Sequence, residues 1–281
     1  MKNFHASFLH GYNMYKIIEK NNIKVLKFNI IESFGLTEHY YSLRKGGVSS
    51  PPFESLNLGL HTSDKPENVI TNRKLLEKNF SIPVRDVIKL EHGDKILPIY
   101  DNKIPNEIPL ADAIMTNVKN VPLSIFYADC TGIFILDPVK KVIALVHAGW
   151  RGTLKAIALK TVEAMKKEYG TDSKNCVSAI CPSIGPCCFE VSEETANLFL
   201  NSFNYYPEIF LKDFSLCISK NNKRYFVNLW NLNKIQLLCA GLKSENIVSS
   251  NICTSCQNDL FFSYRRENRV TGRMGAVFML R

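Results

Sequence analysis

Residues 123–152, LSIFYADCTGIFILDPVKKVIALVHAGWRG, contain the pattern from which the fold is predicted. Three short apolar runs, at 123–127, 132–136 and 141–146, are rich in β-branched and aromatic residues, which is typical of strands. The sequence Asp137-Pro138-Val139-Lys140 favours a turn between the second run and the third. We therefore expect a three-strand meander, which would bring the ends of its strands close together.

Helical periodicity is found on both sides of this stretch. The predicted helices cover residues 66–80, residues 153–169 between a cap at Thr153 and a terminating Gly170, a segment that begins at Ser192, and residues 228–241. A last strand is predicted over 274–280. Hairpin-linked strands with interspersed helices predict the α+β class with a mixed or antiparallel sheet.

The composition is that of a globular protein. Of the 281 residues, 46% are hydrophobic and 22% are charged, which excludes disorder, collagen and coiled coil. The apolar runs are much shorter than the roughly 20 residues of a membrane helix, and the first twenty residues lack the apolar block of a secretory signal. Nine cysteines in such a chain indicate reduced thiols, so we expect a cytoplasmic protein with no membrane partner.

The formal net charge is +9, which two kinds of surface could explain. One is a nucleic-acid groove, and the other is a solvated basic surface with a local anion site. No RNP, zinc-finger or basic-zipper pattern is present, and the basic residues are scattered apart from a cluster at Arg265, Arg266, Arg269 and Arg273. We favour the second explanation and expect no nucleic-acid partner.

Three residues that could bind a metal occur where predicted strands end: His92, Cys130 and His147. Two imidazoles and one thiolate suit zinc, and three protein ligands would leave a coordination position open, as in catalytic zinc sites. The alternative is a buried cysteine with two histidines that have ordinary hydrogen-bond partners. Residue spacing does not decide between them, because nothing in it brings His92 to the other two. A Cys130–His147 nucleophile pair oriented by Asp129 is weaker still, since Asp129 would point away from a strand that carries Cys130.

Glycines 149 and 152 flank Trp150 and Arg151 between a predicted strand and a predicted helix. Free N–H groups at a helix start, with the Arg151 guanidinium, could bind an anion. The segment could equally be a tight turn that packs Trp150 into the core. Both interpretations stay open at this stage.

The remaining cysteine pattern is interpreted as ordinary thiols. Cys253 and Cys256 have CxxC spacing, but a structural zinc site requires a second pair. The adjacent Cys187 and Cys188 are a poor candidate, because neighbouring side chains tend to diverge. A redox pair would need a helix start after Cys256, whereas residues 260–262 are predicted as a strand.

Short motifs extend along most of the chain. They are RKGGVS at 44–49, SLNLG at 55–59, NR at 72–73, HG at 92–93, ADA at 111–113, ADC at 128–130, HAGWRG at 147–152, IGP at 184–186, EV at 190–191, CT at 253–254, FSYRR at 262–266 and TGR at 271–273. In type and order they resemble the polyphenol oxidase family of YfiH or laccase-domain proteins, over roughly residues 40–281. HAGWRG is highly specific to that family.

The resemblance implies a layered α+β domain with mixed sheets, of YfiH/CNF1-like architecture, over residues 36–281. Residues 1–35 would be an N-terminal extension that adds a strand or two at the domain edge. The family's metal site maps onto His92, Cys130 and His147, which would then be both metal ligands and catalytic residues. The implied cofactor is Zn²⁺, with copper as an alternative, and the protein would be a monomer or a small homo-oligomer.

The implied activity is that of a purine nucleoside phosphorylase. It would cleave adenosine, inosine, guanosine and methylthioadenosine with phosphate, and would also deaminate adenosine with zinc. Candidates for binding substrate or phosphate are Arg44, Asn57 and Arg151. Candidates for moving a proton are the carboxylates of residues near the metal ligands, namely Glu91, Asp94, Asp112 and Asp129.

The chain departs from the family pattern at three places. Leu90-Glu91 stands where the family usually has Gln-Val, Thr131-Gly132 stands where it has Leu-Pro, and Cys181 replaces a glycine. These changes leave the metal ligands intact and bear on substrate preference.

Two other functions have less support from the residues. A copper-dependent polyphenol oxidase needs several imidazoles per trinuclear centre, whereas this chain has six histidines and no His-x-His pair. A non-enzymatic zinc-binding regulatory protein would need a fourth protein ligand to close the site.

Overall fold

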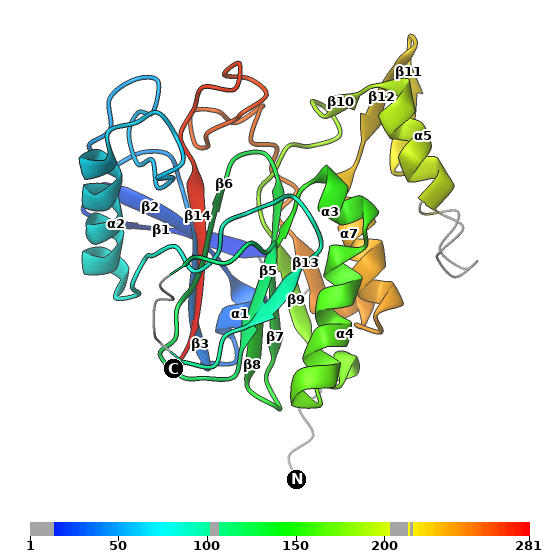
Figure 1. Ribbon diagram of the computed structural model, residues 1–281, viewed down its shortest axis with the longest axis horizontal. Helices are drawn as coiled ribbons and strands as arrows, with labels where there is room; N and C mark the ends of the chain where they lie inside the picture. The colour runs from blue at the N-terminus through cyan, green and yellow to red at the C-terminus, as the bar shows by residue number, and fades with distance from the viewer. Residues whose placement is uncertain (1–13, 102–106, 203–212, 214–215) are drawn as a thin grey trace.

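A computed structural model describes residues 14–101, 107–202, 213 and 216–281. Two large sheets pack face to face, and helices cover the outer face of each sheet (Figure 1). The layers are therefore helix, sheet, sheet and helix. One sheet is antiparallel and the other is mixed, which confirms the predicted α+β class.

The antiparallel sheet has the strand order β1-β2-β3-β14-β6. Its strands are β1 (Tyr15–Lys20), β2 (Ile23–Phe28), β3 (Thr37–Ser42), β14 (Met274–Leu280) and β6 (Leu123–Tyr127). The predicted C-terminal strand is confirmed, and it lies between β3 and β6. Strands β1 and β2 fall in the predicted N-terminal extension and continue this sheet at its edge. Residues 1–13 of that extension lie outside the described residues.

The mixed sheet has the order β13-β9-β7-β8-β5-β4. Its strands are β13 (Ile247–Ser249), β9 (Val177–Ile180), β7 (Thr131–Asp137), β8 (Val142–Ala148), β5 (Ala113–Thr116) and β4 (Ile96–Pro98). Strands β7 and β8 form the predicted hairpin, in which Asp137 Oδ1 accepts hydrogen bonds from the backbone N–H groups of Val139 and Lys140. A small third sheet, β10-β12-β11, contains β10 (Glu190–Val191), β12 (Arg224–Val227) and β11 (Ile218–Asn221).

The predicted meander is wrong at its first strand. Strand β6 pairs with β14 in the antiparallel sheet, with Phe126 opposite Gly275, and it does not pair with β7. The chain crosses from one sheet to the other within residues 128–130, where Asp129 has a left-handed φ of 71°. Local sequence identifies each strand, but the choice of pairing partner depends on β14, which lies far away along the chain.

Alternation of side chains along the strands defines the two sides of the mixed sheet. In β8, Ala144 and Val146 face the helices, whereas Ile143 and Leu145 face the antiparallel sheet. Position 147 has the same parity as 143 and 145, so His147 points into the layer between the two sheets. The same layer contains His92 and Cys130.

Helices cover the two outer faces, as Figure 1 shows. Helix α2 (Pro66–Phe80) lies on the antiparallel sheet, α3 (Trp150–Leu154), α4 (Ile157–Tyr169) and α7 (Leu229–Cys239) lie on the mixed sheet, and α5 (Glu193–Ser202) lies beside the small sheet. The short α1 (Asn29–Glu32) packs between the two large sheets, with Ile31 in their shared core. Single 3₁₀ turns occur at Ser173–Asn175 and Ser244–Asn246. The helices predicted at 66–80, near 192 and at 228–241 are confirmed. No helix in the described part of the chain is long and apolar enough to cross a membrane.

The helix predicted to begin at Thr153 starts earlier and is divided. Gly149 is the N-cap of α3, and Ala156, with a φ of 60°, separates α3 from α4. Thr153 is no cap: its hydroxyl accepts a hydrogen bond from Asn233 of α7. Gly170 ends α4 in the left-handed conformation, as predicted.

Candidate active site

His92, Cys130 and His147 converge at one end of the layer between the sheets. Their ligand atoms all lie within 4.8 Å of one another. His92 is in the loop before β4, Cys130 is in the crossing between the sheets, and His147 is in β8. The β7–β8 register places Gly132 opposite His147, which brings Cys130 to the same end of the hairpin. The structure thus brings the three predicted ligands together.

Asp112, at the start of β5, fixes both histidines. Its carboxylate accepts hydrogen bonds from the backbone N–H groups of His92 (3.0 Å) and Gly93 (2.7 Å), and it bonds Nδ1 of His147 at 2.8 Å. Burial alone would raise the pKa of this carboxyl, which has no exposed surface, but His147 and the two N–H groups hold it below its usual value. Asp112 is therefore an ionised acceptor that orients the two imidazoles.

The free nitrogen of His147 is suited to bind a metal. Nδ1 is engaged by Asp112, while Nε2 is buried and has no hydrogen-bond partner among the described residues. At zinc sites, one ring N–H of a ligating histidine commonly donates to a carboxylate, while the other ring nitrogen binds the metal. The donor set of two imidazoles and a thiolate, with this unpartnered nitrogen, fits a zinc ion held by three protein ligands.

The electrostatics favour the metal-binding form of Cys130, whereas His147 holds a proton that a metal would have to displace. Burial would raise the pKa of the Cys130 thiol, but the two histidines outweigh it and lower the pKa to about 6. Burial would lower the pKa of His147, whereas Cys130 and Asp112 raise it to about 9. Cys130 is thus held as a thiolate near neutral pH, and the thiolate is the form of cysteine that binds metals.

The two glycines of the HAGWRG segment permit close packing. A Cβ on Gly149 would lie 3.3 Å from Cys130 Sγ and 3.4 Å from His92 Cδ2, and one on Gly152 would lie 2.9 Å from the carbonyl oxygen of Gly93. Helix α3 has only five residues, and the exposed guanidinium of Arg151 stacks on the Trp150 ring at 4.2 Å. These contacts favour the tight-turn interpretation over an anion site at the helix start.

A cavity of about 660 Å³ opens beside the three ligands, which form part of its wall. Its other walls carry apolar and aromatic side chains, Phe126 and Tyr264 among them, the basic residues His61, Lys89 and Arg273, and the acidic Asp86. The Arg273 guanidinium donates to the carbonyl oxygens of Thr271 and Gly272 and lies 5.4 Å from the Tyr264 ring. In the described part of the chain Arg273 forms no ion pair, so its charge is available to an anion in the cavity.

The three predicted phosphate-binding residues do not line this cavity. Arg44 pairs with Glu267 at 2.8 Å and stacks on Phe262. Asn57 is fully buried, where it donates to Thr62 and Asp64 and accepts from the N–H of Arg273. Arg44 and Asn57 hold the loops around the site in place, and Arg151 lies outside the cavity on Trp150.

The predicted proton carriers occupy four different settings. Asp112 orients the histidines, and Asp94 forms ion pairs with Lys155 and Lys160. Asp129 is buried and points away from the ligands, as its position next to Cys130 predicted: its carboxylate accepts from Thr254, Ser263 and the N–H of Arg265. Glu91 is exposed and adjoins His92.

Sequence reasoning missed Arg273, Tyr264 and His61 as cavity residues. Arg273 belongs to the arginine cluster singled out from the charge pattern, and both Tyr264 and Arg273 lie in motifs that carry the family resemblance. These signals place the residues in the family pattern but do not show that they face a cavity. His61 has no comparable signal in the sequence.

Residues 38–281 match a family model described as multi-copper polyphenol oxidoreductase laccase. The chain belongs to this family. Members similar to it include the purine nucleoside phosphorylase YlmD of Bacillus subtilis, which is 32% identical over 83% of this chain and 85% of its own length. The purine nucleoside phosphorylase YfiH of Escherichia coli K12 is 32% identical over 85% of this chain and 92% of its own length.

Solved structures of family members have the same fold. The crystal structure of YlmD from Geobacillus stearothermophilus has a TM-score of 0.86 and 29% identity, and it covers 96% of this chain and all of that protein, 100%. The structure of a YfiH protein from Bacillus licheniformis has a TM-score of 0.84 and 28% identity, with 96% and 100% coverage. The YfiH-like architecture expected from the sequence is confirmed.

One departure from the family pattern has a structural explanation. A Cβ on Gly132 would clash with the Tyr127 hydroxyl, so a glycine at this position leaves room for the Tyr127 side chain. Tyr127 lines the cavity, and its ring lies 5.6 Å from the His147 ring. The Thr131-Gly132 pair therefore shapes the cavity wall next to a metal ligand.

Proposed function

We propose that this chain is a purine nucleoside phosphorylase that also deaminates adenosine, with Zn²⁺ held by His92, Cys130 and His147. The observation that carries the proposal is the placement of three pre-oriented metal ligands in the wall of a 660 Å³ cavity that also contains Arg273. The volume is in the range of small-molecule sites. The relatives named purine nucleoside phosphorylase, at about 32% identity, support the substrate class.

Phosphorolysis breaks the bond between C1′ of the ribose and the base nitrogen and forms a bond from C1′ to a phosphate oxygen. It requires a bound phosphate and stabilisation of the charge that develops as the glycosidic bond breaks. Arg273 is the residue that we assign to the phosphate, because a guanidinium without an ion-pair partner binds phosphate through paired N–H groups. The apolar walls, including Phe126 and Tyr264, would pack against the base.

Deamination adds water at C6 of adenosine and releases the amino group as ammonia, which leaves inosine. Zinc, when bound, lowers the pKa of a coordinated water to about 7. Asp112 would keep His92 and His147 in the orientation that coordination needs. Of the predicted proton carriers, we assign the transfer to Glu91, because Asp94, Asp112 and Asp129 already have partners.

The decisive test uses zinc-loaded protein with adenosine, inosine, guanosine and methylthioadenosine, with and without phosphate, and chromatography of the products. Free base that appears only with phosphate supports the phosphorylase, and inosine formed from adenosine without phosphate supports the deaminase. If neither appears with zinc in the site, the proposal is wrong. Glu91→Gln should slow deamination and leave phosphorolysis unchanged.

A laccase activity has less support, in spite of the family description. Of the six histidines, His5 and His10 lie outside the described residues, and His39 is buried where it accepts a hydrogen bond from the N–H of Phe28. Even all six histidines are too few for a trinuclear copper centre together with a further copper site, which need roughly two or three imidazoles per copper. Oxygen-dependent turnover of a phenol by copper-loaded protein would contradict this argument.

A further inference from the structure

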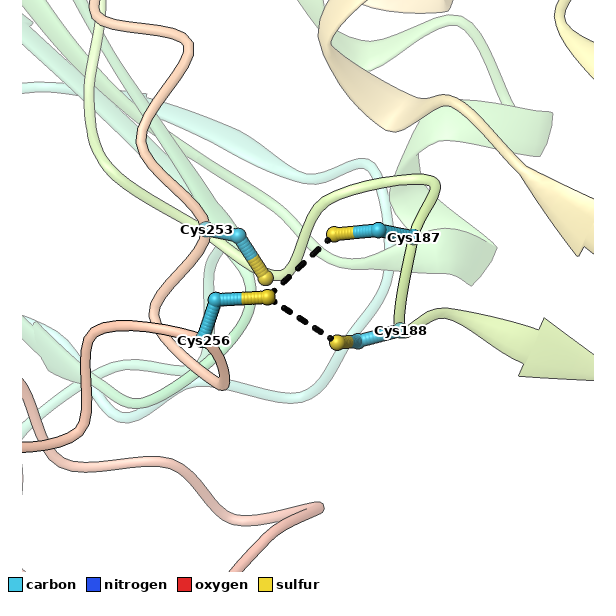
Figure 2. Close-up of side chains that lie close together, drawn as sticks. All are labelled: Cys187, Cys188, Cys253 and Cys256. Carbon is cyan, nitrogen blue, oxygen red and sulfur yellow. Dashed lines mark hydrogen bonds between the residues drawn. The ribbon is translucent and has the colours of Figure 1, made fainter.

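Cys187, Cys188, Cys253 and Cys256 meet outside the candidate active site. Their sulfur atoms all lie within 4.8 Å of one another, and Figure 2 shows the side chains of two separate loops pointing toward a common centre. The expectation that adjacent Cys187 and Cys188 diverge is wrong, because both sulfurs contact Cys256. The pair that CxxC spacing needed for a structural metal site is therefore present.

Backbone geometry explains how adjacent cysteines converge. A turn follows Gly185, whose carbonyl oxygen accepts hydrogen bonds from the N–H groups of Cys188 and Phe189. A Cβ on Gly185 would lie 2.7 Å from the Trp230 ring and 3.1 Å from Cys253 Cβ, so a glycine lets the two loops approach. The strand predicted at 260–262 is not formed: residues 254–260 form turns, followed by a bend at 261, and Cys253 and Cys256 lie in a compact loop.

The two loops are held in register by their own hydrogen bonds. Ser183 donates its N–H to the carbonyl of Ile252 and accepts from the N–H of Thr254, in an isolated bridge next to Cys253. The N–H of Gly185 donates to Cys253 Sγ at 3.2 Å. This hydrogen bond ties the Cys253 side chain to the loop that carries Cys187 and Cys188.

The sulfur separations suit a tetrahedral metal. Cys256 Sγ lies 3.5 Å from Cys187 Sγ and 3.4 Å from Cys188 Sγ. Four sulfurs at about 2.3 Å from a central zinc lie about 3.8 Å apart, whereas a disulfide requires about 2.05 Å. Small side-chain adjustments would bring all four sulfurs onto one ion.

We propose that these four cysteines bind one Zn²⁺ in a closed structural site, separate from the His92, Cys130 and His147 group. Four thiolates match the preference of zinc for soft ligands in tetrahedral geometry and leave no position for water or substrate. The site therefore takes no part in the chemistry of the cavity. It does not depend on the proposed function, and it stands or fails on metal content alone.

The expected role is to fasten the loop that supports the crossing between the sheets. Thr254 lies between two of the ligands in sequence, and its hydroxyl donates to Asp129 at 2.6 Å. Arg265, farther along the same segment, donates its N–H to Asp129 and its side chain to the carbonyl of Glu190 just beyond Cys188. Zinc would join the two loops at a point between these contacts and so hold Asp129, the neighbour of Cys130.

The test is the zinc content of purified, reduced protein, measured by mass spectrometry of the metal and by release with a thiol reagent. The wild type should hold two zinc ions per chain, one in each group. Cys253→Ser with Cys256→Ser should retain only the ion of the other group, and Cys130→Ala should retain only the four-cysteine ion. Cys239→Ser, at a half-buried cysteine outside both groups, should retain both.

A second measurement separates zinc binding from misfolding. Co²⁺ bound by four thiolates has stronger sulfur charge-transfer absorption than Co²⁺ bound by one, so Cys130→Ala should keep most of that absorption. Cys256→His, at an exposed position, should keep the metal with a weaker sulfur band, because zinc accepts a Cys₃His set.

A wild-type content of one zinc, lost in Cys130→Ala and unchanged in the double serine variant, would overturn the proposal. Four freely titrating thiols or a Cys187–Cys256 disulfide in reduced, zinc-supplied protein would do the same.

Discussion

The two groups of residues that we propose to bind zinc differ in ligand number and in surroundings. His92, Cys130 and His147 provide three ligands, are backed by the buried carboxylate of Asp112 and adjoin a cavity. The four cysteines provide a complete tetrahedral set between two loops, and none of them lines that cavity. An incomplete set beside a cavity can bind substrate or water, whereas a complete set can only hold structure together. We therefore assign a catalytic role to the first group and a structural role to the second.

The strongest test of this contrast is to remove one ligand from each group. Cys130→Ala should lower deamination by more than about 100-fold, since changes at outer-shell partners alone typically cost 10–100-fold. Cys256→Ser should retain most of the activity but lower the melting temperature. Steady-state kinetics and thermal unfolding of the two variants check the pair. Full activity in metal-free Cys130→Ala would remove the distinction between the groups.

Asp112→Asn tests whether orientation of the ligands, and not only their presence, matters. The change keeps the shape of the side chain, but an amide cannot accept all three hydrogen bonds that the carboxylate accepts. We expect zinc affinity or activity to fall about 10–100-fold. Metal titration with a competing chelator measures the affinity, and the four-cysteine ion, which does not contact Asp112, should be unaffected.

Arg273→Met asks whether the cavity binds phosphate. Loss of a charged hydrogen-bond donor should raise the KM for phosphate about 10-fold or more, with a smaller effect on deamination, which uses no phosphate. Arg151→Met is the matched control, because that guanidinium lies on Trp150 outside the cavity. If Arg151→Met raises the KM for phosphate and Arg273→Met leaves it unchanged, the assignment is reversed.

The smallest expected effect is on the pH dependence of the free energy of unfolding. It must be distinguished from the loss of stability that follows when a bound metal dissociates at low pH. Burial lowers the pKa of His39 to about 3 in the folded protein, against about 6.5 in the unfolded chain. As the pH falls below 6.5, the unfolded chain binds a proton that the native protein excludes. His39 therefore reduces stability by at most about 1.4 kcal/mol per pH unit in that range. His39→Gln, which keeps an acceptor for the N–H of Phe28, should show a shallower pH slope in urea unfolding.

Features that depend on residues close together in the sequence could be predicted, whereas features that depend on distant residues could not. The β7–β8 hairpin and helix α2 depend on neighbouring residues and were predicted correctly. The pairing of β6 with β14 was not predicted, because both strands are buried on two faces and their residue patterns do not identify a partner strand.

The candidate site followed the same rule. The residue types of His92, Cys130 and His147 indicated zinc, but their meeting depends on Asp112 and on the crossing at Asp129. The four-cysteine group was missed because its two halves lie on loops that are distant in the sequence. The ion pair of Arg44 with Glu267 could not be predicted for a related reason, because the two residues are equally remote in the sequence.

The position of β14 has a consequence for how the protein is made. This strand leaves the ribosome after every other described strand, yet it lies in the middle of its sheet, between β3 and β6. Until it emerges, β1, β2 and β3 have no hydrogen-bonded connection to β6, so the nascent chain holds two separate pieces of that sheet. Because β6 leads directly into Cys130, we expect the group of His92, Cys130 and His147 to reach its final geometry only when β14 inserts.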